Sequence, residues 1–308
     1  MVDSLQKLAL RLRGTVEFDV PLARYTTYRI GGPAAALVIP ESTEDVVEVL
    51  KFCNDAAIPS LALGHGSNVL VSDAGFAGVV VRVGKGMDWL EEGVDGPEVW
   101  QAGAGVPTPR LARITARAGL SGIQRLIGVP GTVGGGVVMN AGAHRQNFSQ
   151  TVRSVEIVDS DWKVRTIAGS EIQWRYRSSG IENAIVTAAT FEFGRADPNV
   201  LERDIQRHFE WRRKGTPFDE PCCGSVFLNP QGAGQHSAGQ LIDAAGLKGF
   251  RVGAAQVSQK HANYIVNLGG ATASDVKAVI DGVRERVLAG FGVELQLEVR
   301  LIGDEEQA

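Results

Sequence analysis

Two short glycine-rich stretches constrain the fold of this chain more than any other feature. They are Gly64-His65-Gly66-Ser67-Asn68 and the stretch from Gly128 to Gly136, and each follows a segment of strand formers. Glycine permits positive φ and lets backbone N–H groups approach a phosphate closely. Such turns suit the pyrophosphate of a dinucleotide, but for either stretch alone a tight structural turn is the better explanation. Neither has G-x-G-x-x-G before a helix or a following G-K-[ST], so a Rossmann site and a P-loop are disfavoured.

Strand and helix patterns alternate around these turns. Ser42 is a helix cap followed by acidic residues, and the apolar positions Val46, Val49, Leu50 and Cys53 recur on one face of a helix that ends near Asn54. Further strands are expected over 35–39, 58–63, 78–83 and 99–102, and a helix over 107–118 that is stopped by Gly119.

The second half of the chain predicts a different mixture. We expect a hairpin of 152–158 with 162–167, strands over 184–193, 263–268 and 293–302, and helices over 201–214 and 274–288, the last closed by Gly290. The changes of pattern divide the chain into residues 1–90, 91–196 and 197–308. Together they predict an α+β protein of two subdomains and a third α+β domain.

Composition excludes several function classes. With 31 Lys and Arg against 35 Asp and Glu, the net charge of -4 offers no attraction for nucleic acid. No apolar stretch of about 18 residues would insert into a membrane. The first residues lack the basic-then-apolar order of a secretory signal, so a cytoplasmic protein is expected. Cys53, Cys222 and Cys223 have no C-x-x-C spacing, so neither a disulfide framework nor a metal site is indicated.

A series of motifs in a fixed order resembles a known family. The motifs are Tyr28 to Gly32, Gly64 to Leu70, Gly128 to Gly135, Met139 to Ala143, Tyr176 to Ser179, Gly224 to Pro230, Ala238 to Ile242 and Glu298 to Arg300. Over about Arg24 to Gly303 they resemble the UDP-N-acetylenolpyruvoylglucosamine reductases (the MurB family), flavoenzymes of peptidoglycan precursor synthesis. The chain runs directly from Ser179 to the strand expected at 184–193. This leaves no space for the substrate-clamping tyrosine loop of type I enzymes, so the chain resembles type II.

The resemblance implies a fold and a cofactor. Two α+β subdomains would hold FAD between them, as in the vanillyl-alcohol-oxidase flavoproteins, and the third domain would bind substrate. FAD would be bound non-covalently. The residues implied to line it are Gly64, Gly66, Ser67, Asn68, Val69, Gly128, Pro130, Gly131, Gly134 and Gly135.

The resemblance also implies a reaction. NADPH would reduce FAD, and a hydride would then reach C3 of the enolpyruvyl ether of UDP-N-acetylglucosamine, giving UDP-N-acetylmuramate. Charge develops in the substrate carboxylate and C2 needs a proton. The family pattern assigns Arg177 and Glu298 to the carboxylate, with Glu298 protonated or bridged by Arg177, and Ser225 to the proton. It assigns Asn229, Lys248 and His261 to the sugar nucleotide.

Each catalytic assignment has a simpler structural alternative. Ser225 follows a glycine and could be a turn residue, and Arg177 could be a surface charge. Glu298 could face outward from a strand on which Glu294 competes at even spacing. The sequence also departs from the family pattern: His144-Arg145 replace a usual Tyr-Gly pair that includes a substrate-facing aromatic, Leu228 replaces a frequent lysine, and Gln124 replaces a glutamate.

Two other functions compete with the reductase. In an FAD oxidase of the same fold, His65 beside the first glycine turn would carry a covalent flavin. A catalytically silent flavin or sugar-nucleotide binder is the other alternative, but it has no use for a proton donor at Ser225. The pair Cys222-Cys223 next to this serine invites a redox role, although small buried residues are the simpler interpretation.

Overall fold

The computed structural model describes residues 2–181, 183–231 and 236–303. The chain forms two compact units, which we call unit 1 (Met1–Asp19, Ala35–His65, Gly78–Arg212) and unit 2 (Val20–Ala34, Gly66–Ala77, Arg213–Ala308). Each unit mixes helices with strands and has its own hydrophobic core. The expected α+β class is confirmed, and the division into three parts stays a prediction.

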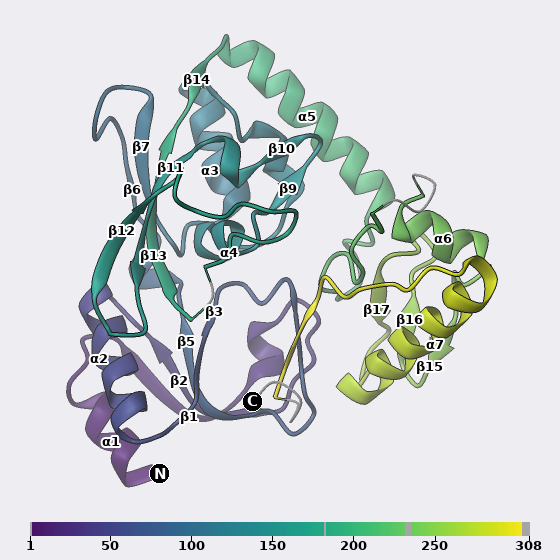
Figure 1. The fold of residues 1–308 in the computed structure, drawn as a ribbon, viewed down its shortest axis with the longest axis horizontal. Helices are drawn as coiled ribbons and strands as arrows, with labels where there is room; N and C mark the ends of the chain where they lie inside the picture. The colour runs from purple at the N-terminus through teal and green to yellow at the C-terminus, as the bar shows by residue number, and fades with distance from the viewer. Residues whose placement is uncertain (1, 182, 232–235, 304–308) are drawn as a thin grey trace. The chain divides into compact units, whose positions relative to one another are not determined.

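An antiparallel sheet of five strands forms the larger layer of unit 1 (Figure 1). In spatial order its strands are β12 (Val164–Ala168), β11 (Val152–Val158), β13 (Ile185–Glu192), β7 (Val99–Gly103) and β6 (Leu90–Glu91). The expected hairpin is confirmed, with Val158 opposite Val164. Its second strand starts later than expected because Trp162 adopts a left-handed conformation, with φ +60°, in the turn. Helix α4 (Val133–Val138) packs against β13 and β7 of this sheet. Helix α3 (Thr108–Arg117) contacts the short strand at Leu120–Ser121 instead.

A second sheet of four strands carries the N-terminal helices. Its order is β1 (Thr15–Pro21), β2 (Pro33–Ile39), β5 (Phe76–Arg82) and β3 (Ser60–Leu63). Helix α1 (Val2–Ala9) precedes β1 along the chain, and α2 (Thr43–Asp55) connects β2 to β3. The predicted cap is confirmed, because the Ser42 side chain accepts a hydrogen bond from the Asp45 amide. Val46, Val49 and Cys53 are buried, as the periodicity predicts, since that face of α2 packs into the core.

Two short strand pairs and a long helix complete unit 1. They are β8 (Leu120–Ser121) paired with β14 (Gly194–Arg195), β9 (Gly142–Ala143) paired with β10 (Gln146–Asn147), and α5 (Pro198–Gly215), whose last residues belong to unit 2. Helix α5 buries Leu201 and Ile205 against Ala116 and Ile127. It is longer than the expected helix because Pro198 supplies a first turn that needs no amide donor.

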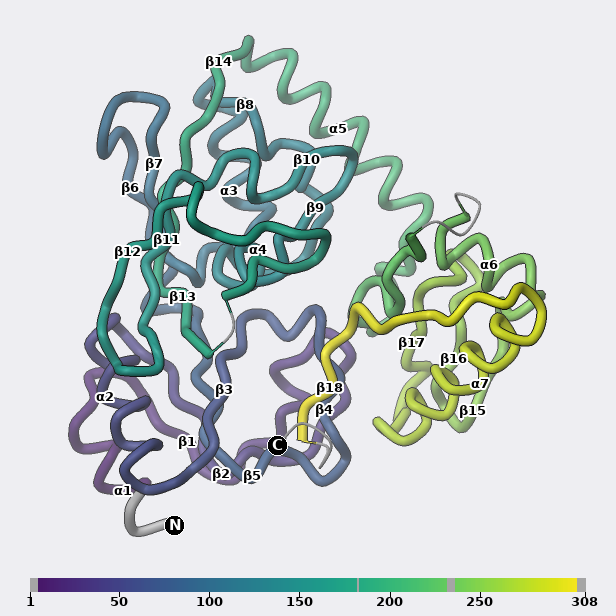
Figure 2. Tube along the Cα trace, in the orientation of Figure 1, coloured from purple at the N-terminus to yellow at the C-terminus, as the bar shows by residue number. Residues whose placement is uncertain are grey.

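Unit 2 is built on a small antiparallel sheet and two helices. Its elements are β15 (Arg251–Val252), β16 (Ala255–Val257), β17 (Ile265–Asn267), α6 (Ala238–Ala244), α7 (Ala273–Phe291), and β4 (Val69–Val71), which pairs in parallel with β18 (Arg300–Ile302) (Figure 2). Helix α7 packs on β15, β16 and α6 and buries Val276, Val279 and Val283. No helix in the described ranges is both long and apolar enough to cross a membrane.

Two expectations about the end of the chain are wrong. Helix α7 passes through Gly290 and ends at Phe291, because Gly292 is the residue that adopts the left-handed cap conformation, with φ +66°. The strand expected over 293–302 is confined to β18. Residues 296–299 instead bond singly to residues 226–228, including an isolated bridge between Phe227 and Leu297, so no continuous ladder forms there.

Candidate active site

The first glycine turn is fixed in unit 2 by contacts that exclude a side chain at its second glycine. Gly66 has φ +61°, and a Cβ there would overlap the carbonyl oxygen of Tyr25. The Gly66 carbonyl accepts a hydrogen bond from the Thr27 amide at 3.1 Å. Thr27 Oγ1 in turn donates to the Cys222 carbonyl at 2.6 Å. The turn is therefore attached to the segment that precedes Ser225.

The second glycine stretch meets the first within unit 1. A Cβ at Gly64 would lie 2.6 Å from Oγ1 of Thr132, the residue that precedes α4. His65 stays partly exposed beside this contact. Partial burial, followed by the charge of Arg82, lowers the pKa of the His65 imidazole. Gly64 and the second glycine stretch, both predicted to line FAD, thus lie together in unit 1.

The glycines of unit 1 that are predicted to contact the flavin differ in what a side chain at each position would meet. A Cβ at Gly128 would overlap the side chain of Arg212, and one at Gly134 would lie 2.9 Å from Cβ of Ala104. Gly135 is exposed in the middle of α4, and the nearest atom to its Cβ would be Thr132 Oγ1 at an ordinary 3.8 Å. Among the described residues, no contact therefore requires glycine at position 135.

Arg177 lies in a strained turn of unit 1. The turn is closed by hydrogen bonds from the Arg175 amide to the Ser178 carbonyl at 2.8 Å and from the Ser178 amide to the Arg175 carbonyl at 3.3 Å. Arg177 has φ +59°, and its Nη2 donates to the Gly142 carbonyl at 3.1 Å. Its guanidinium lies 5.0 Å from the ring centre of Tyr176. A non-glycine residue in this region is strained and persists only where the surrounding structure holds it there.

Buried groups anchor the Arg177 turn on residues 138–142. Asn140 Nδ2 donates to the Arg175 carbonyl at 3.0 Å, and Asn140 Oδ1 accepts from the Ser149 amide at 3.1 Å. The Ser179 amide donates to the Val138 carbonyl at 3.1 Å. Sequence reasoning quoted Asn140 only as part of a motif and missed this role.

The departures at His144 and Gln124 belong to one polar cluster with α5. The His144 ring centre lies 4.2 Å from that of His208 and 4.8 Å from that of Trp211. Gln124 Nε2 donates to Asp204 at 3.2 Å, and Arg125 pairs with the same carboxylate at 2.9 Å. A glutamate at position 124 would set a second carboxylate against Asp204. The imidazole of His144 therefore packs on α5.

In unit 2 the segments that carry Ser225 and Glu298 run side by side. The Glu298 amide donates to the carbonyl of Val226, the residue after Ser225, at 2.8 Å. Asn68 Nδ2 donates to the Glu298 carbonyl at 3.0 Å. Glu294, the rival carboxylate, is exposed and pairs with Arg284 at 3.7 Å.

Ser67 and Val69, which follow the first glycine turn, also lie beside the segments that carry Ser225 and Glu298. A Cβ at Gly224 would lie 3.8 Å from the Ser67 carbonyl oxygen. Val69 opens β4 and pairs with Arg300 of β18. The structure thus brings Ser67, Asn68 and Val69 next to the segments of Ser225 and Glu298 within unit 2.

The three residues predicted to contact the sugar nucleotide also have partners inside unit 2. Lys248 Nζ pairs with Asp243 at 2.7 Å. Asn229 Oδ1 accepts a hydrogen bond from the Ala238 amide at 3.1 Å, at the start of α6. His261 Nδ1 accepts from the Asn263 amide at 3.2 Å, which leaves the proton of the neutral ring on Nε2.

The burial of Cys53 and Cys223 favours a packing role for these two cysteines. Cys223 is buried, and this burial raises the pKa of its thiol. The neighbouring Tyr28 hydroxyl is also buried, which raises its pKa, and the Cys223 thiol adds to the effect. Burial raises the pKa of Cys53 to about 11. A thiol held protonated is a poor nucleophile and redox group.

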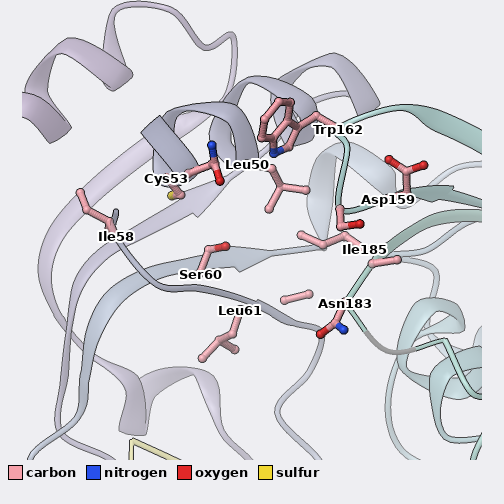
Figure 3. Close-up of a pocket in the computed structure, with 13 residues that line it drawn as sticks. Leu50, Cys53, Ile58, Ser60, Leu61, Asp159, Trp162, Asn183 and Ile185 are labelled. Atoms are coloured by element: carbon pink, nitrogen blue, oxygen red, sulfur yellow. The ribbon is translucent and has the colours of Figure 1, made fainter. Parts of the chain in front are cut away.

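A separate cavity of about 420 Å³ opens in unit 1 among α2, β3, the β11–β12 turn and the start of β13 (Figure 3). Leu50, Leu61, Trp162 and Ile185 supply apolar walls, and Asn183 is among its polar lining residues. None of the predicted catalytic or cofactor residues lines it. In the described ranges, no group of three His, Cys, Asp or Glu side chains is arranged to hold a metal ion.

Comparison with known protein families shows to which class of protein this chain belongs. Residues 34–168 match the family described as an FAD binding domain, and residues 216–302 match the C-terminal domain of UDP-N-acetylenolpyruvoylglucosamine reductase. The first match includes Gly64, Gly66 and the whole second glycine stretch. The fold and the turns therefore define a flavin-dependent oxidoreductase.

Individual relatives identify the family within this class of oxidoreductases. A reductase of that name from Heliobacterium modesticaldum is 46% identical over 95% of this chain and 92% of its own length, and one from Halalkalibacterium halodurans is 39% identical over 99% of both. A crystal structure of the UDP-N-acetylenolpyruvylglucosamine reductase MurB from Thermus caldophilus matches with a TM-score of 0.80 and 33% identity, over 95% of this chain and 100% of that one. The chain belongs to the UDP-N-acetylenolpyruvoylglucosamine reductase family.

Proposed function

We propose that this chain binds FAD without a covalent link and uses NADPH to reduce the enolpyruvyl ether of UDP-N-acetylglucosamine to UDP-N-acetylmuramate. The observation that carries the proposal is the hydrogen bond from the Glu298 amide to the Val226 carbonyl at 2.8 Å. It sets the proposed acid, Ser225, and the proposed carboxylate-binding residue, Glu298, on adjoining segments. A simple flavin binder gains nothing from that arrangement.

The residues of the glycine turns fit the cofactor. Gly66 leaves no room for a side chain, and a Cβ at Gly135 on α4 would meet, among the described residues, only Thr132 Oγ1 at 3.8 Å. Bound FAD would supply hydride transfer from NADPH to C3 of the enolpyruvyl group. The residues that would hold it are Gly64, Gly66, Ser67, Asn68, Val69, Gly128, Pro130, Gly131, Gly134 and Gly135.

The chain's own residues would manage charge and a proton. The guanidinium of Arg177, directed by its left-handed turn, would bind the substrate carboxylate as negative charge builds there. Glu298, protonated or bridged by Arg177, would hydrogen-bond the same group. Ser225 would deliver a proton to C2, a step that needs the hydroxyl within hydrogen-bond reach of that carbon.

The sugar nucleotide would be held in unit 2 by Asn229, Lys248 and His261. Lys248 would exchange its pairing with Asp243 for the diphosphate, which keeps the ammonium charge-paired in both states. His261 would offer the proton on Nε2, because Nδ1 is already occupied by the Asn263 amide. NADPH and UDP sugars are cytoplasmic metabolites, so this function also assigns the protein to the cytoplasm.

The test is stoichiometric turnover. The FAD-loaded protein should consume one NADPH for each enolpyruvyl substrate added, with no oxygen uptake. Acid precipitation should release the flavin into the supernatant. NADPH consumption that needs oxygen but no substrate, with flavin left on a His65 peptide, would support the oxidase instead.

A further inference from the structure

We propose that Asn263 is the positioning residue that sets Ser225 and Glu298 in register with one another. This inference rests on the proposed function, because it assumes that these two residues act on the substrate. Asn263 itself would not touch substrate or cofactor. It would act through the backbone on both sides of the site.

Asn263 bonds to both residues that follow Ser225. Its backbone carbonyl accepts from the Val226 amide at 2.9 Å. Its side-chain Oδ1 accepts from the Phe227 amide at 2.9 Å, and its Nδ2 donates to the Phe227 carbonyl at 2.8 Å. The side chain is only 4% exposed, so water cannot replace these bonds. One residue therefore fixes the direction in which the chain leaves Ser225.

The same segment passes this placement on to Glu298. Val226 is held by Asn263 through its amide and accepts the Glu298 amide at its carbonyl, at 2.8 Å. The Glu298 carbonyl is held in turn by Asn68 Nδ2 at 3.0 Å. A shift of Val226 would therefore move the backbone of Glu298 as well as that of Ser225.

The amide at position 263 cannot be replaced by another group of the same shape. Phe227 presents an amide donor and a carbonyl acceptor, so its partner must accept with one atom and donate with the other. An aspartate fits the space, but its ionised form has two acceptors, and one would face the Phe227 carbonyl. When protonated it can donate again. An Asn263→Asp variant should therefore regain register as the pH falls.

Asn267 is a matched control in the same unit. It is 6% exposed, its Nδ2 donates to the Tyr28 carbonyl at 3.0 Å, and its Oδ1 accepts from the Gly269 amide at 2.9 Å. It thus clamps backbone as Asn263 does, but none of these bonds involves residues 225–228. Asn267→Asp creates the same buried carboxylate without a side-chain bond to residues 225–228.

The experiment compares Asn263→Asp and Asn267→Asp as FAD-loaded proteins in single-turnover half-reactions. Both should melt earlier than the wild type, and both should accept electrons from NADPH at the wild-type rate. Only Asn263→Asp should be slow in flavin reoxidation by the enolpyruvyl substrate, on the order of 10²-fold, the scale of a misplaced catalytic group. That loss should shrink as the pH is lowered. If Asn263→Asp does not retain flavin, Asn263→Ser takes its place, with the same expected loss and no recovery at low pH.

Equal reoxidation losses in the Asn263 and Asn267 variants would overturn the proposal, and so would a wild-type rate in the Asn263 variant. A Ser225→Ala protein measured alongside separates this failure from that of the proposed mechanism. If Ser225→Ala is slow and the Asn263 variant is not, only the positioning role is lost. If Ser225→Ala is itself reoxidised at the wild-type rate, the serine is not the acid and the proposed mechanism fails.

Discussion

Arg177 of unit 1 lies in a turn with φ +59°, whereas Ser225 and Glu298 of unit 2 lie on segments joined by ordinary backbone hydrogen bonds. The contrast extends through both units. Among the described non-glycine residues with positive φ, Arg29 alone belongs to unit 2, and unit 1 holds Asp19, Ala57, Asn140, His144, Arg145, Trp162, Arg177 and Asn183. One of those eight, Asn140, lies on residues 138–142, which anchor the Arg177 turn.

The difference shows two ways of directing a side chain. A left-handed residue costs about 1–3 kcal/mol and persists only where its surroundings leave no alternative. Asn140 and Ser179 supply that constraint around Arg177. In unit 2, Asn263 fixes the backbone without strain. At Arg177 we therefore expect glycine and alanine substitutions to lower activity equally but to differ in the free energy of unfolding. Substitutions at Ser225 should change activity alone.

Ser225→Ala should give the largest effect and test the unstrained side of the comparison. The fold, the flavin content and the reduction by NADPH should be unchanged, because the hydroxyl is proposed to act only on C2 of the substrate. Reoxidation by the enolpyruvyl substrate should slow on the order of 10²-fold or more. Ser225→Cys should retain more, since a thiol can still donate a proton. Stopped-flow measurement of the two half-reactions checks this.

Arg177→Gly should separate activity from stability on the strained side. Reoxidation should slow by about 10²–10³-fold, as for the loss of one preorganised group at a developing anion. Arg177→Ala should be equally slow, because both variants lack the guanidinium. Glycine tolerates φ +59° and alanine does not, so the glycine variant should be the more stable of the two by about 1 kcal/mol. Urea unfolding of both variants measures the strain, and equal stabilities would show that the turn stores none.

Gly135→Ala should sharpen the comparison at the proposed flavin surface. Alanine is the better helix former, so the flavin-free protein should gain about 0.5–1 kcal/mol, since the new methyl meets nothing closer than 3.8 Å. The Kd for FAD should rise because the methyl group would occupy the surface assigned to the cofactor. Gly136→Ala is the control, because its Cβ would overlap the Phe148 ring and destabilise the protein by about 1–3 kcal/mol. An unchanged flavin Kd for Gly135→Ala would remove position 135 from the cofactor site.

Local patterns predicted elements of the fold that depend on residues close in sequence. The Ser42 cap, the buried face of α2 and the β11–β12 hairpin all follow from spacing over fewer than about 20 residues. The order of motifs supplied the candidate residues. Spacing could not distinguish Gly290 from Gly292 as the end of α7, because both are glycines and only the backbone conformation separates them.

Contacts between distant parts of the chain were beyond the reach of these patterns. The bonds of Asn263 to Phe227 join residues 36 positions apart, and the bond of Asn140 to Arg175 spans 35. No periodicity records such pairs, and an isolated asparagine is also a common turn residue. The sequence therefore named Arg177, Ser225 and Glu298 as candidates but not the residues that direct them. The left-handed conformation of Arg177 could not be predicted either, because it depends on the contact of Asn140 with this turn.

The smallest expected effect is the pH dependence of the stability of unit 1. It arises at His144, which adopts a left-handed conformation, and at the neighbouring His208. Burial lowers the pKa of both His144 and His208, and each ring also faces cationic neighbours, with Asp204 opposing them. A histidine pKa below its unfolded value of about 6.5 means that the unfolded chain binds more protons. Stability should therefore be full above that pH and fall as the solution is acidified through the folded pKa.

His144→Asn should weaken this dependence. Asparagine tolerates the φ of +51° at this position and carries no titrating group. It also removes the imidazolium that His208 would face at low pH, 4.2 Å away between ring centres. The melting temperature measured from pH 5 to pH 8 should then change less than in the wild type, by an amount worth under about 1 kcal/mol. The Ser225 segment of unit 2 contains no such pair, so Ser225→Ala should leave the wild-type slope intact. An identical slope in His144→Asn would mean that acid destabilises the protein elsewhere.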